Sequence, residues 1–206
     1  MIRTRVGIFG GTFDPVHVGH LVAAVNAMAG AKLDKVLIVV ANVPWQKQGT
    51  RILSPAPVRF ALVKAAIAGV AGLEACDFEI RRGGQSYTID TVREISMLYP
   101  RSDLFLIVGA DAALGLSSWE RSESLSALVT LIVVNRPGTR VDGQVTSSWK
   151  TLFVEVPAID ISSTDIRARV REKRPLDFLL TRETIDFING SGLYLDDGEE
   201  LRGIGK

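Results

Sequence analysis

Residues 6–20 of the chain read Val-Gly-Ile-Phe-Gly-Gly-Thr-Phe-Asp-Pro-Val-His-Val-Gly-His. The stretch opens with a short apolar run, turns at Gly10-Gly11 and continues into a helical pattern, for which Asp14 and Pro15 suit the N-cap and the first helical position. A strand, a glycine turn and a helix in this order favour the first unit of a doubly wound α/β sheet. In such a sheet ligands bind at the carboxyl ends of the strands.

The same alternation continues along the chain. Apolar, β-branched runs predict strands that are covered on both faces, and helical stripes lie between them. Units of roughly 30 residues are typical of right-handed crossovers in a parallel sheet. We therefore expect an α/β, doubly wound fold with a mostly parallel sheet. The predicted strands are 5–10, 36–41, 104–108 and 131–135, with 73–80 and 152–156 less central, and the predicted helices are 18–28, 60–67 and 88–98.

The C-terminal part differs, because it contains two helical patterns and no further strand. Residues 163–172 and 181–188 form these patterns, and Asn189-Gly190 is expected to close the second. We expect a small helical segment at about 162–190 that completes the domain.

Length and composition indicate one globular domain. The chain has 206 residues, of which 47% are hydrophobic and 23% are charged. We expect this domain to cover residues 1–195, with 136–150 as a long surface loop and 196–206 as a flexible tail.

Charge and cysteine content exclude several classes of protein. The chain has 24 Lys and Arg residues and 23 Asp and Glu residues, so its net charge is close to zero. This balance argues against a protein that depends on non-specific electrostatic attraction to nucleic acid or membranes. The single cysteine, Cys76, cannot form an internal disulfide. Every apolar run is far shorter than the ~18 residues that a membrane-spanning helix needs, and no signal-peptide core is present. The expected location is the cytoplasm.

Both histidines of the chain lie in the opening stretch. His17 and His20 are three residues apart, so they share one face in the first turns of the predicted helix. A helix N-terminus attracts anions, and two imidazoles add donors for phosphate. The glycines lack the spacing of a dinucleotide fingerprint, and the chain has too few histidines and cysteines for a structural zinc site. The alternative is that both histidines only cap the helix.

A second motif, Ile161-Ser162-Ser163-Thr164-Asp165-Ile166-Arg167, predicts another helix start. Ser162 and Asp165 have the spacing of a capping box, with Asp in place of the usual Glu. Hydroxyls and N–H groups there suit phosphate, and Arg167 could bridge phosphate oxygens. Taken alone, a capped helix with a surface arginine explains the motif more simply.

Together the two motifs resemble a known family. Gly-Gly-Thr-Phe-Asp-Pro-x-His-x-Gly-His at 10–20 resembles the signature of the nucleotidylyltransferase superfamily, and with Ile-Ser-Ser-Thr-x-Ile-Arg at 161–167 it resembles the bacterial nicotinate-nucleotide adenylyltransferases. The resemblance runs from Val6 to about Tyr194. It implies a Rossmann-like fold and transfer of the adenylyl group of ATP to nicotinate mononucleotide. The products would be nicotinate adenine dinucleotide and pyrophosphate, in NAD biosynthesis, with Mg²⁺ bound mainly through the ATP phosphates.

The resemblance also implies a role for individual residues, and it implies no metal ligand among them. Trp119 would stack on the pyridine ring, although a core tryptophan is the alternative, and Asp111 would lie near the nucleotide sugars or cap a helix. The implied catalytic residues are Thr12, His17 and His20; those for ATP are Gly10, Gly11, Phe13, Gly109, Asp111, Ser163, Thr164 and Arg167; and those for the mononucleotide are Trp45, Lys47, Thr88, Trp119 and Arg136.

One segment departs from the family pattern. Many members have Pro-His where this chain has Trp45-Gln46, and Lys47 follows at the basic position expected to meet the mononucleotide phosphate. Arg136 is a weaker candidate for the same phosphate. Trp45 could stack over the site as a lid or simply pack.

Other functions stay open at this point. The acceptor could be nicotinamide mononucleotide or phosphopantetheine, although Ser86-Tyr87-Thr88 with Trp119 favours a pyridine mononucleotide. The chain could also be a non-catalytic nucleotide-binding regulator, against which the intact motifs argue. A nucleic-acid module is poorly supported by the charge balance. The sequence leaves the oligomeric state open, a homo-oligomer included.

Overall fold

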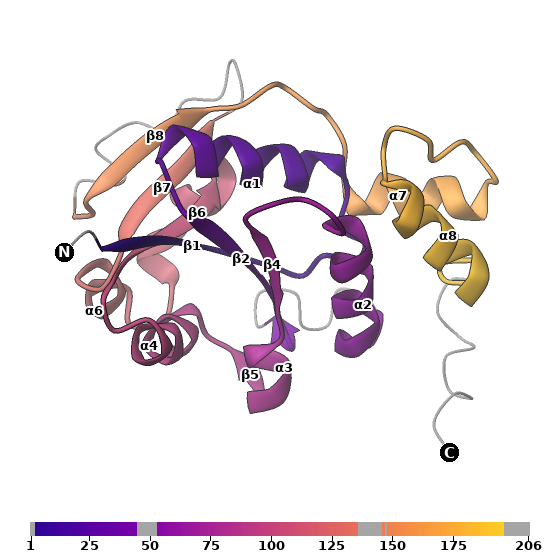
Figure 1. Cartoon of the computed structure of the whole chain (residues 1–206). Helices are drawn as coiled ribbons and strands as arrows, with labels where there is room; N and C mark the ends of the chain where they lie inside the picture. The colour runs from indigo at the N-terminus through magenta and orange to yellow at the C-terminus, as the bar shows by residue number, and fades with distance from the viewer. Residues whose placement is uncertain (1–2, 45–52, 136–145, 147, 196–206) are drawn as a thin grey trace.

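A six-stranded parallel sheet forms the centre of the computed structural model, which describes residues 3–44, 53–135, 146 and 148–195 (Figure 1). The strands follow the order β4-β2-β1-β6-β7-β8 across the sheet. This order reverses direction between β1 and β6, as in a doubly wound fold, so the predicted fold class is confirmed. The strands are β1 (Thr4–Gly11), β2 (Lys35–Val40), β4 (Leu73–Cys76), β6 (Ser102–Gly109), β7 (Thr130–Asn135) and β8 (Thr151–Glu155).

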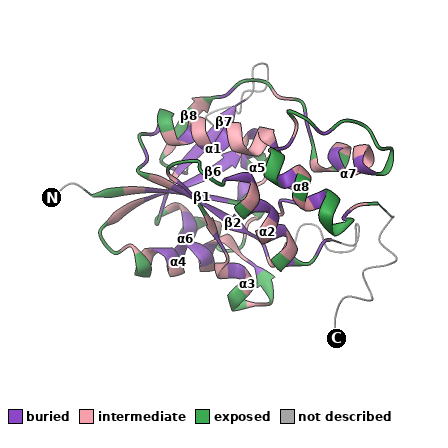
Figure 2. Ribbon diagram, turned by 45° about the vertical axis from the view of Figure 1, so that its right-hand side comes forward, coloured by how far each residue is buried: buried purple, intermediate pink, exposed green. Residues whose placement is uncertain are grey.

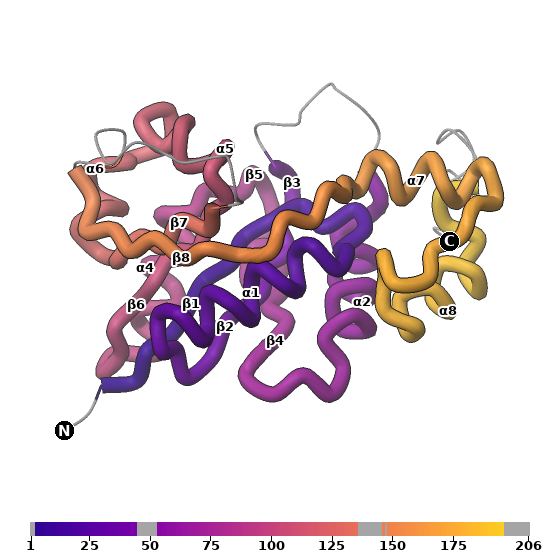
Figure 3. The backbone as a smooth tube through the Cα atoms, turned by 90° about the horizontal axis from the view of Figure 1, so that it is seen from above, coloured from indigo at the N-terminus to yellow at the C-terminus, as the bar shows by residue number. Residues whose placement is uncertain are grey.

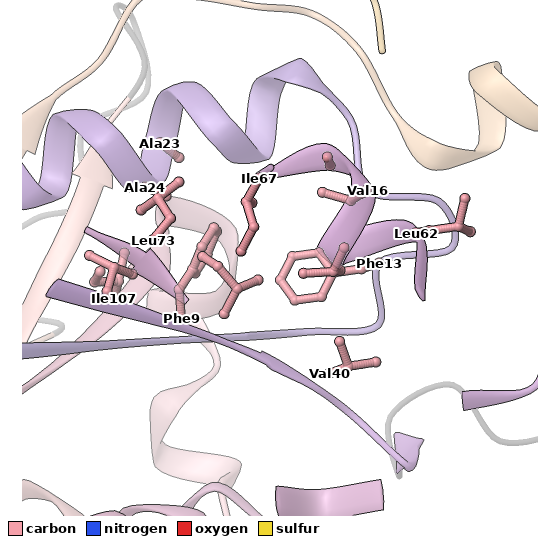
Figure 4. Packing of buried hydrophobic residues seen from close by; sticks show 14 of the residues in the cluster. Phe9, Phe13, Val16, Ala23, Ala24, Val40, Leu62, Ile67, Leu73 and Ile107 are labelled. Carbon is pink, nitrogen blue, oxygen red and sulfur yellow. The ribbon is translucent and has the colours of Figure 1, made fainter. Parts of the chain in front are cut away.

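Helices cover both faces of the sheet, which explains the continuous apolar runs of the strands. On one face Phe9 and Ile107 pack with Ala24 of α1 (Val18–Gly30), and the close-up shows these side chains together beneath that helix (Figure 4). On the other face Ile8 packs in a second cluster with Ile95 of α4 (Thr88–Leu98). The central strands are accordingly buried along most of their length (Figure 2).

The remaining elements flank this sheet. The last two helices, α7 and α8, lie beyond its end beside α2 (Figure 3). Two very short strands pair in parallel as a separate sheet. These elements are α2 (Ala56–Ala66), α3 (Phe78–Arg82), α5 (Ala110–Leu114), the 3₁₀ turn η2 (Leu116–Ser118), α6 (Ser122–Ser126), α7 (Ser163–Arg171), α8 (Arg182–Ser191), β3 (Val43–Pro44) and β5 (Gln85–Ser86).

The start of α1 differs from the prediction. Asp14 and Pro15 form a turn joined by a cis peptide bond, and the helix begins at Val18 with His17 as its N-cap. Asp14 and Val16 are each 1% exposed. Tertiary packing of this turn therefore outweighs the local preference of Asp-Pro for a helix start.

Three other boundaries were predicted wrongly. The helix predicted at 60–67 begins already at Ala56. The predicted strand 73–80 ends at Cys76, and α3 follows it, because a short apolar run does not distinguish a strand from a helix. Helix α8 continues through Asn189-Gly190 to Ser191, and the left-handed Gly192, with φ of 65°, caps it instead.

Most of the predicted loop 136–150 and the whole of the tail 196–206 lie outside the described residues. Within the loop, Trp149 is described and is buried in the second core cluster. In the described part of the chain, no helix is long and apolar enough to cross a membrane.

Candidate active site

Two adjoining cavities lie at the carboxyl edge of the sheet, where β1 and β6 end. One has a volume of about 700 Å³ and the other of about 260 Å³. Gly10, Gly11, Thr12 and Gly109 line both cavities. The glycine turn therefore lies at the boundary where the two cavities meet. A Cβ atom at Gly10 or Gly109 would meet no atom within 4 Å, so the backbone is open to a ligand at both strand ends.

The larger cavity brings the two motifs together. The residues of the predicted site that line it are Gly10, Gly11, Thr12, Phe13, His17, His20, Gly109, Asp111, Ser163, Thr164 and Arg167. These residues come from three regions that are far apart in the sequence, namely β1 with the start of α1, the start of α5, and α7. The structure therefore places every residue predicted for catalysis or for ATP at one cavity.

The histidine pair is held in a fixed geometry. The backbone N–H of His17 donates to Nδ1 of His20 at 3.2 Å, and the two ring centroids are 3.8 Å apart. Because Nδ1 of His20 accepts, the neutral ring carries its proton on Nε2. Nδ1 of His20 thus caps the N–H of the N-cap residue of α1, as the capping alternative expects of this ring, while a role limited to capping stays untested. The same two rings line the larger cavity, where they could contact a ligand.

Phe13 supports the pair from the other side. Its ring meets the His20 ring edge-on, with centroids 5.0 Å apart and planes at 77°. Its φ of 50° folds the ring back over β1, so a Cβ atom at Gly11 would lie 2.6 Å from Cζ of Phe13. This position therefore requires glycine. Phe13 as a whole is 2% exposed, so its predicted contact with ATP stays a prediction.

The second motif is fastened to the first. The Ser162 hydroxyl accepts from the Asp165 N–H at 3.1 Å, so the predicted cap of α7 is confirmed. The Ser163 hydroxyl donates to the carbonyl of Pro15 at 2.8 Å. Arg167 donates from Nη1 to the carbonyl of Asp14 at 2.7 Å and from Nη2 to Oγ1 of Thr164 at 3.0 Å. These contacts place the Arg167 guanidinium at the edge of the larger cavity.

The smaller cavity contains the described residues predicted for the mononucleotide. Thr88, at the start of α4, and Trp119, which follows η2, both line it. Trp119 is half-buried and packs against the second core cluster, and its predicted stacking on the pyridine ring stays a prediction. Trp45, Lys47 and Arg136 lie outside the described residues, and their predicted roles stay predictions.

Glu79 is a cavity residue that sequence reasoning missed. This carboxylate is buried in the wall of the smaller cavity and accepts from the Thr91 hydroxyl at 2.6 Å. Arg82 in turn donates to that hydroxyl at 2.8 Å. The network fixes α4 against α3 beside Thr88. Nothing in the sequence pattern distinguishes Glu79 from a surface glutamate.

Arg59 is a second missed residue, and it is 1% exposed within α2. Its guanidinium donates to the carbonyls of Ser54, Thr12, Ala41 and Asn42, at 2.7 to 3.0 Å. It thereby joins the shared wall of the two cavities to the end of β2. The sequence did contain a signal for its burial, because Arg59 falls at helical spacing on the stripe of otherwise apolar residues that α2 buries.

No group of three or more His, Cys, Asp or Glu side chains within 3–44, 53–135, 146 and 148–195 is arranged to hold a metal ion. Divalent ions can instead be bound largely by phosphate oxygens and water. The described residues fit that arrangement, because the larger cavity offers donors for phosphate together with two carboxylates, Asp14 and, at the start of α5, Asp111.

Comparisons with known proteins agree with this geometry. A protein of Corynebacterium kroppenstedtii named "probable nicotinate-nucleotide adenylyltransferase" is 40% identical over 199 residues, covering 95% of this chain and 93% of its own. A protein of Desulfitobacterium hafniense with the same name is 41% identical, covering 92% and 95%.

Solved structures show the same fold. Nicotinic acid mononucleotide adenylyltransferase of Plasmodium falciparum, complexed with NaAD, matches with a TM-score of 0.76 at 19% identity, covering 93% of this chain and 97% of that one. The profile of the cytidylyltransferase-like family matches residues 8–169. With both motifs at one cavity and relatives at about 40% identity along nearly the whole chain, the chain belongs to the nicotinate-nucleotide adenylyltransferases within the cytidylyltransferase-like family.

Proposed function

We propose that this chain transfers the adenylyl group of ATP to nicotinate mononucleotide, giving nicotinate adenine dinucleotide and pyrophosphate in NAD biosynthesis. The observation that carries the proposal is the pair of cavities that meet at residues 10–12. A nucleotide in each cavity would bring the mononucleotide phosphate and the α-phosphate of ATP together at this shared wall. Both substrates are charged nucleotides of cellular metabolism, so we place the enzyme in the cytoplasm.

ATP would occupy the larger cavity. Asp111 would accept from ribose hydroxyls, while Thr164, at the N-terminus of α7, and Arg167, one turn further along the helix, would hold the terminal phosphates. His17 and His20 would then lie beside the α-phosphate, because they are between the glycine turn and α7. Mg²⁺, carried mainly by the ATP phosphates, would neutralise part of their charge.

Nicotinate mononucleotide would occupy the smaller cavity. The exposed part of Trp119 would stack on the pyridine ring, and the N-terminus of α4 at Thr88 would donate to the nicotinate carboxylate. Lys47 would contact its phosphate, with Arg136 as a weaker candidate, and Trp45 would either close over the site or pack.

The reaction needs no general base. The nucleophile is a phosphate monoester whose second pKa is near ~6, so it is already ionised at neutral pH. The protein must align this oxygen with the α-phosphorus and stabilise the charge that develops there. The N–H at Nε2 of His20 and the imidazole of His17 are suited to stabilising this charge.

The acceptor is tested by comparing turnover on nicotinate and nicotinamide mononucleotides with ATP and Mg²⁺. We expect a higher kcat/KM for the nicotinate compound, because the N-terminus of α4 stabilises its negatively charged carboxylate more than the neutral amide of the nicotinamide compound. Equal or reversed preference would contradict the assignment of the acceptor. Removal of Mg²⁺ with a chelator is expected to abolish turnover on both.

Substitution of Gly19 tests the histidine geometry. A Cβ atom there would lie 3.1 Å from Nδ1 of His17 and 3.0 Å from Cγ2 of Ile161. Gly19→Ala should therefore push the His17 ring by a few tenths of an ångström and lower kcat by about tenfold, since ~1 Å of misplacement can cost 10²-fold. Thermal unfolding should change little, because alanine favours the helix. An unchanged kcat would show that the ring position is not critical.

Substitution of Trp119 tests the pyridine subsite. Stacking of a base on an aromatic side chain contributes about 1–3 kcal/mol, so Trp119→Ala should raise the KM for nicotinate mononucleotide about tenfold or more. The KM for ATP should stay the same, and Trp119→Phe should retain most of the affinity. Steady-state kinetics with each substrate varied measures both constants. Equal rises in both KM values would point to loss of core packing instead.

A further inference from the structure

Tyr194, which follows α8 near the C-terminus, contacts the first motif. Its hydroxyl donates to Oδ1 of Asp14 at 2.8 Å, across 180 residues of sequence. The neighbouring Leu193 is buried in the first core cluster, which anchors this segment of chain. A second contact lies close by, since the N–H of Val18 donates to the carbonyl of Leu179 at 2.9 Å. The C-terminal helical part therefore touches the first motif on both sides of His17.

Asp14 connects Tyr194 to the larger cavity. The residue lines this cavity and is 1% exposed. Its Oδ2 atom accepts from the Ser54 N–H at 3.3 Å, and its backbone carbonyl accepts from Nη1 of Arg167 at 2.7 Å. The segment after α8, the start of α2 and the middle of α7 thus converge on one residue. A shift of Asp14 would move the carbonyl that orients the Arg167 guanidinium.

The Tyr194 hydroxyl remains a donor in this setting. Burial, followed by the negative charge of Asp14, raises the pKa of Tyr194 far above its usual value. The phenol therefore stays protonated at neutral pH and can donate to Asp14. A hydrogen bond to a carboxylate in such a site is stronger than one between neutral groups.

We propose that Tyr194 is a positioning residue for the ATP phosphates, which acts through Asp14 on Arg167. The proposal rests on the proposed function, because that assigns the larger cavity to ATP. Tyr194 does not line either cavity described above, so it acts without touching the nucleotide. The expected effect is selective, since Asp14 lines the larger cavity and not the smaller one.

The test is Tyr194→Phe in the full chain, which removes one oxygen atom and keeps the ring. Dissociation constants for Mg-ATP and for nicotinate mononucleotide are measured separately by calorimetry, together with steady-state kinetics. Tyr99→Phe removes a hydroxyl at the end of α4, away from both cavities. Ile188→Val loosens the packing of α8, where Ile188 is buried, and leaves the Tyr194 hydroxyl in place.

The expected result is a rise of about tenfold in the dissociation constant for ATP in Tyr194→Phe, the size that loss of a hydrogen bond to a charged group produces. The constant for nicotinate mononucleotide should not change, and neither control should affect ATP binding. The proposal is overturned by an unchanged ATP constant, by equal weakening of both substrates, or by the same ATP effect in Ile188→Val. A wild-type chain that binds ATP and forms no dinucleotide would contradict the proposed function alone.

Discussion

Replacement of His20 by alanine, or of His17 by alanine, is expected to lower kcat by about 10²–10³-fold, the typical loss when a donor aimed at developing charge is removed. Both rings line the cavity assigned to ATP, and the bond from the His17 N–H to Nδ1 of His20 fixes the pair, with ring centroids 3.8 Å apart, before substrate binds. The loss should fall on kcat more than on ATP affinity, because Arg167 and the N-terminus of α7 contribute to binding independently. Rapid-quench measurement of dinucleotide formation separates the two quantities.

Two further variants distinguish the chemical role of His20 from its role in capping α1. His20→Asn can still accept from the His17 N–H, as Nδ1 does, but it lacks a donor at the place of Nε2. His20→Gln can place an amide N–H near the place of Nε2. We expect His20→Asn to be as inactive as His20→Ala and His20→Gln to retain more activity. Near-wild-type kcat in His20→Asn or in His17→Ala would refute the assigned role.

Replacement of Arg59 by methionine is expected to reduce the free energy of unfolding by about 3–5 kcal/mol, because carbonyls that are left buried without a donor each cost about 1–3 kcal/mol. The guanidinium joins four backbone carbonyls, including that of Thr12 in the shared wall of the cavities. Methionine keeps much of the length and apolar volume of the stem, so the loss reports on the hydrogen bonds. Urea unfolding measures it.

A matched control is Arg93→Met in α4, where the arginine side chain is exposed. Its effect should stay within about 0.5 kcal/mol, as is usual for surface substitutions. A similar effect of both variants would contradict the role assigned to Arg59. Arg59→Lys should lie between them, since an ammonium keeps the charge but cannot match the fork of the guanidinium.

The fold could be predicted because its dominant pattern is local. Runs such as 104–108 and 131–135 are apolar on both faces, which indicates strands covered on both sides of a sheet. Boundaries failed where tertiary contacts decide. Asp-Pro at 14–15 has a helix-start preference, but burial of Asp14 makes it a turn, and Asn189-Gly190 stays helical because Gly192 takes the left-handed position.

The site was predictable to the extent that its residues occur in two compact motifs. The contacts that orient those motifs were not, because they join residues far apart in the chain through groups with no sequence signature. The bond from Tyr194 to Asp14 spans 180 residues, and the bond from Arg59 to Thr12 spans 47. Arg59 alone could have been found, from its place on an apolar helix stripe.

The most direct test of adenylyl transfer to nicotinate mononucleotide uses ATP labelled at the α-phosphorus. The chain is incubated with this ATP, Mg²⁺ and nicotinate mononucleotide, and the products are separated. The label is expected in nicotinate adenine dinucleotide, with unlabelled pyrophosphate formed in equal amount and only when the mononucleotide is present. Label recovered in AMP without dinucleotide, or no pyrophosphate release in the presence of both substrates, would contradict it.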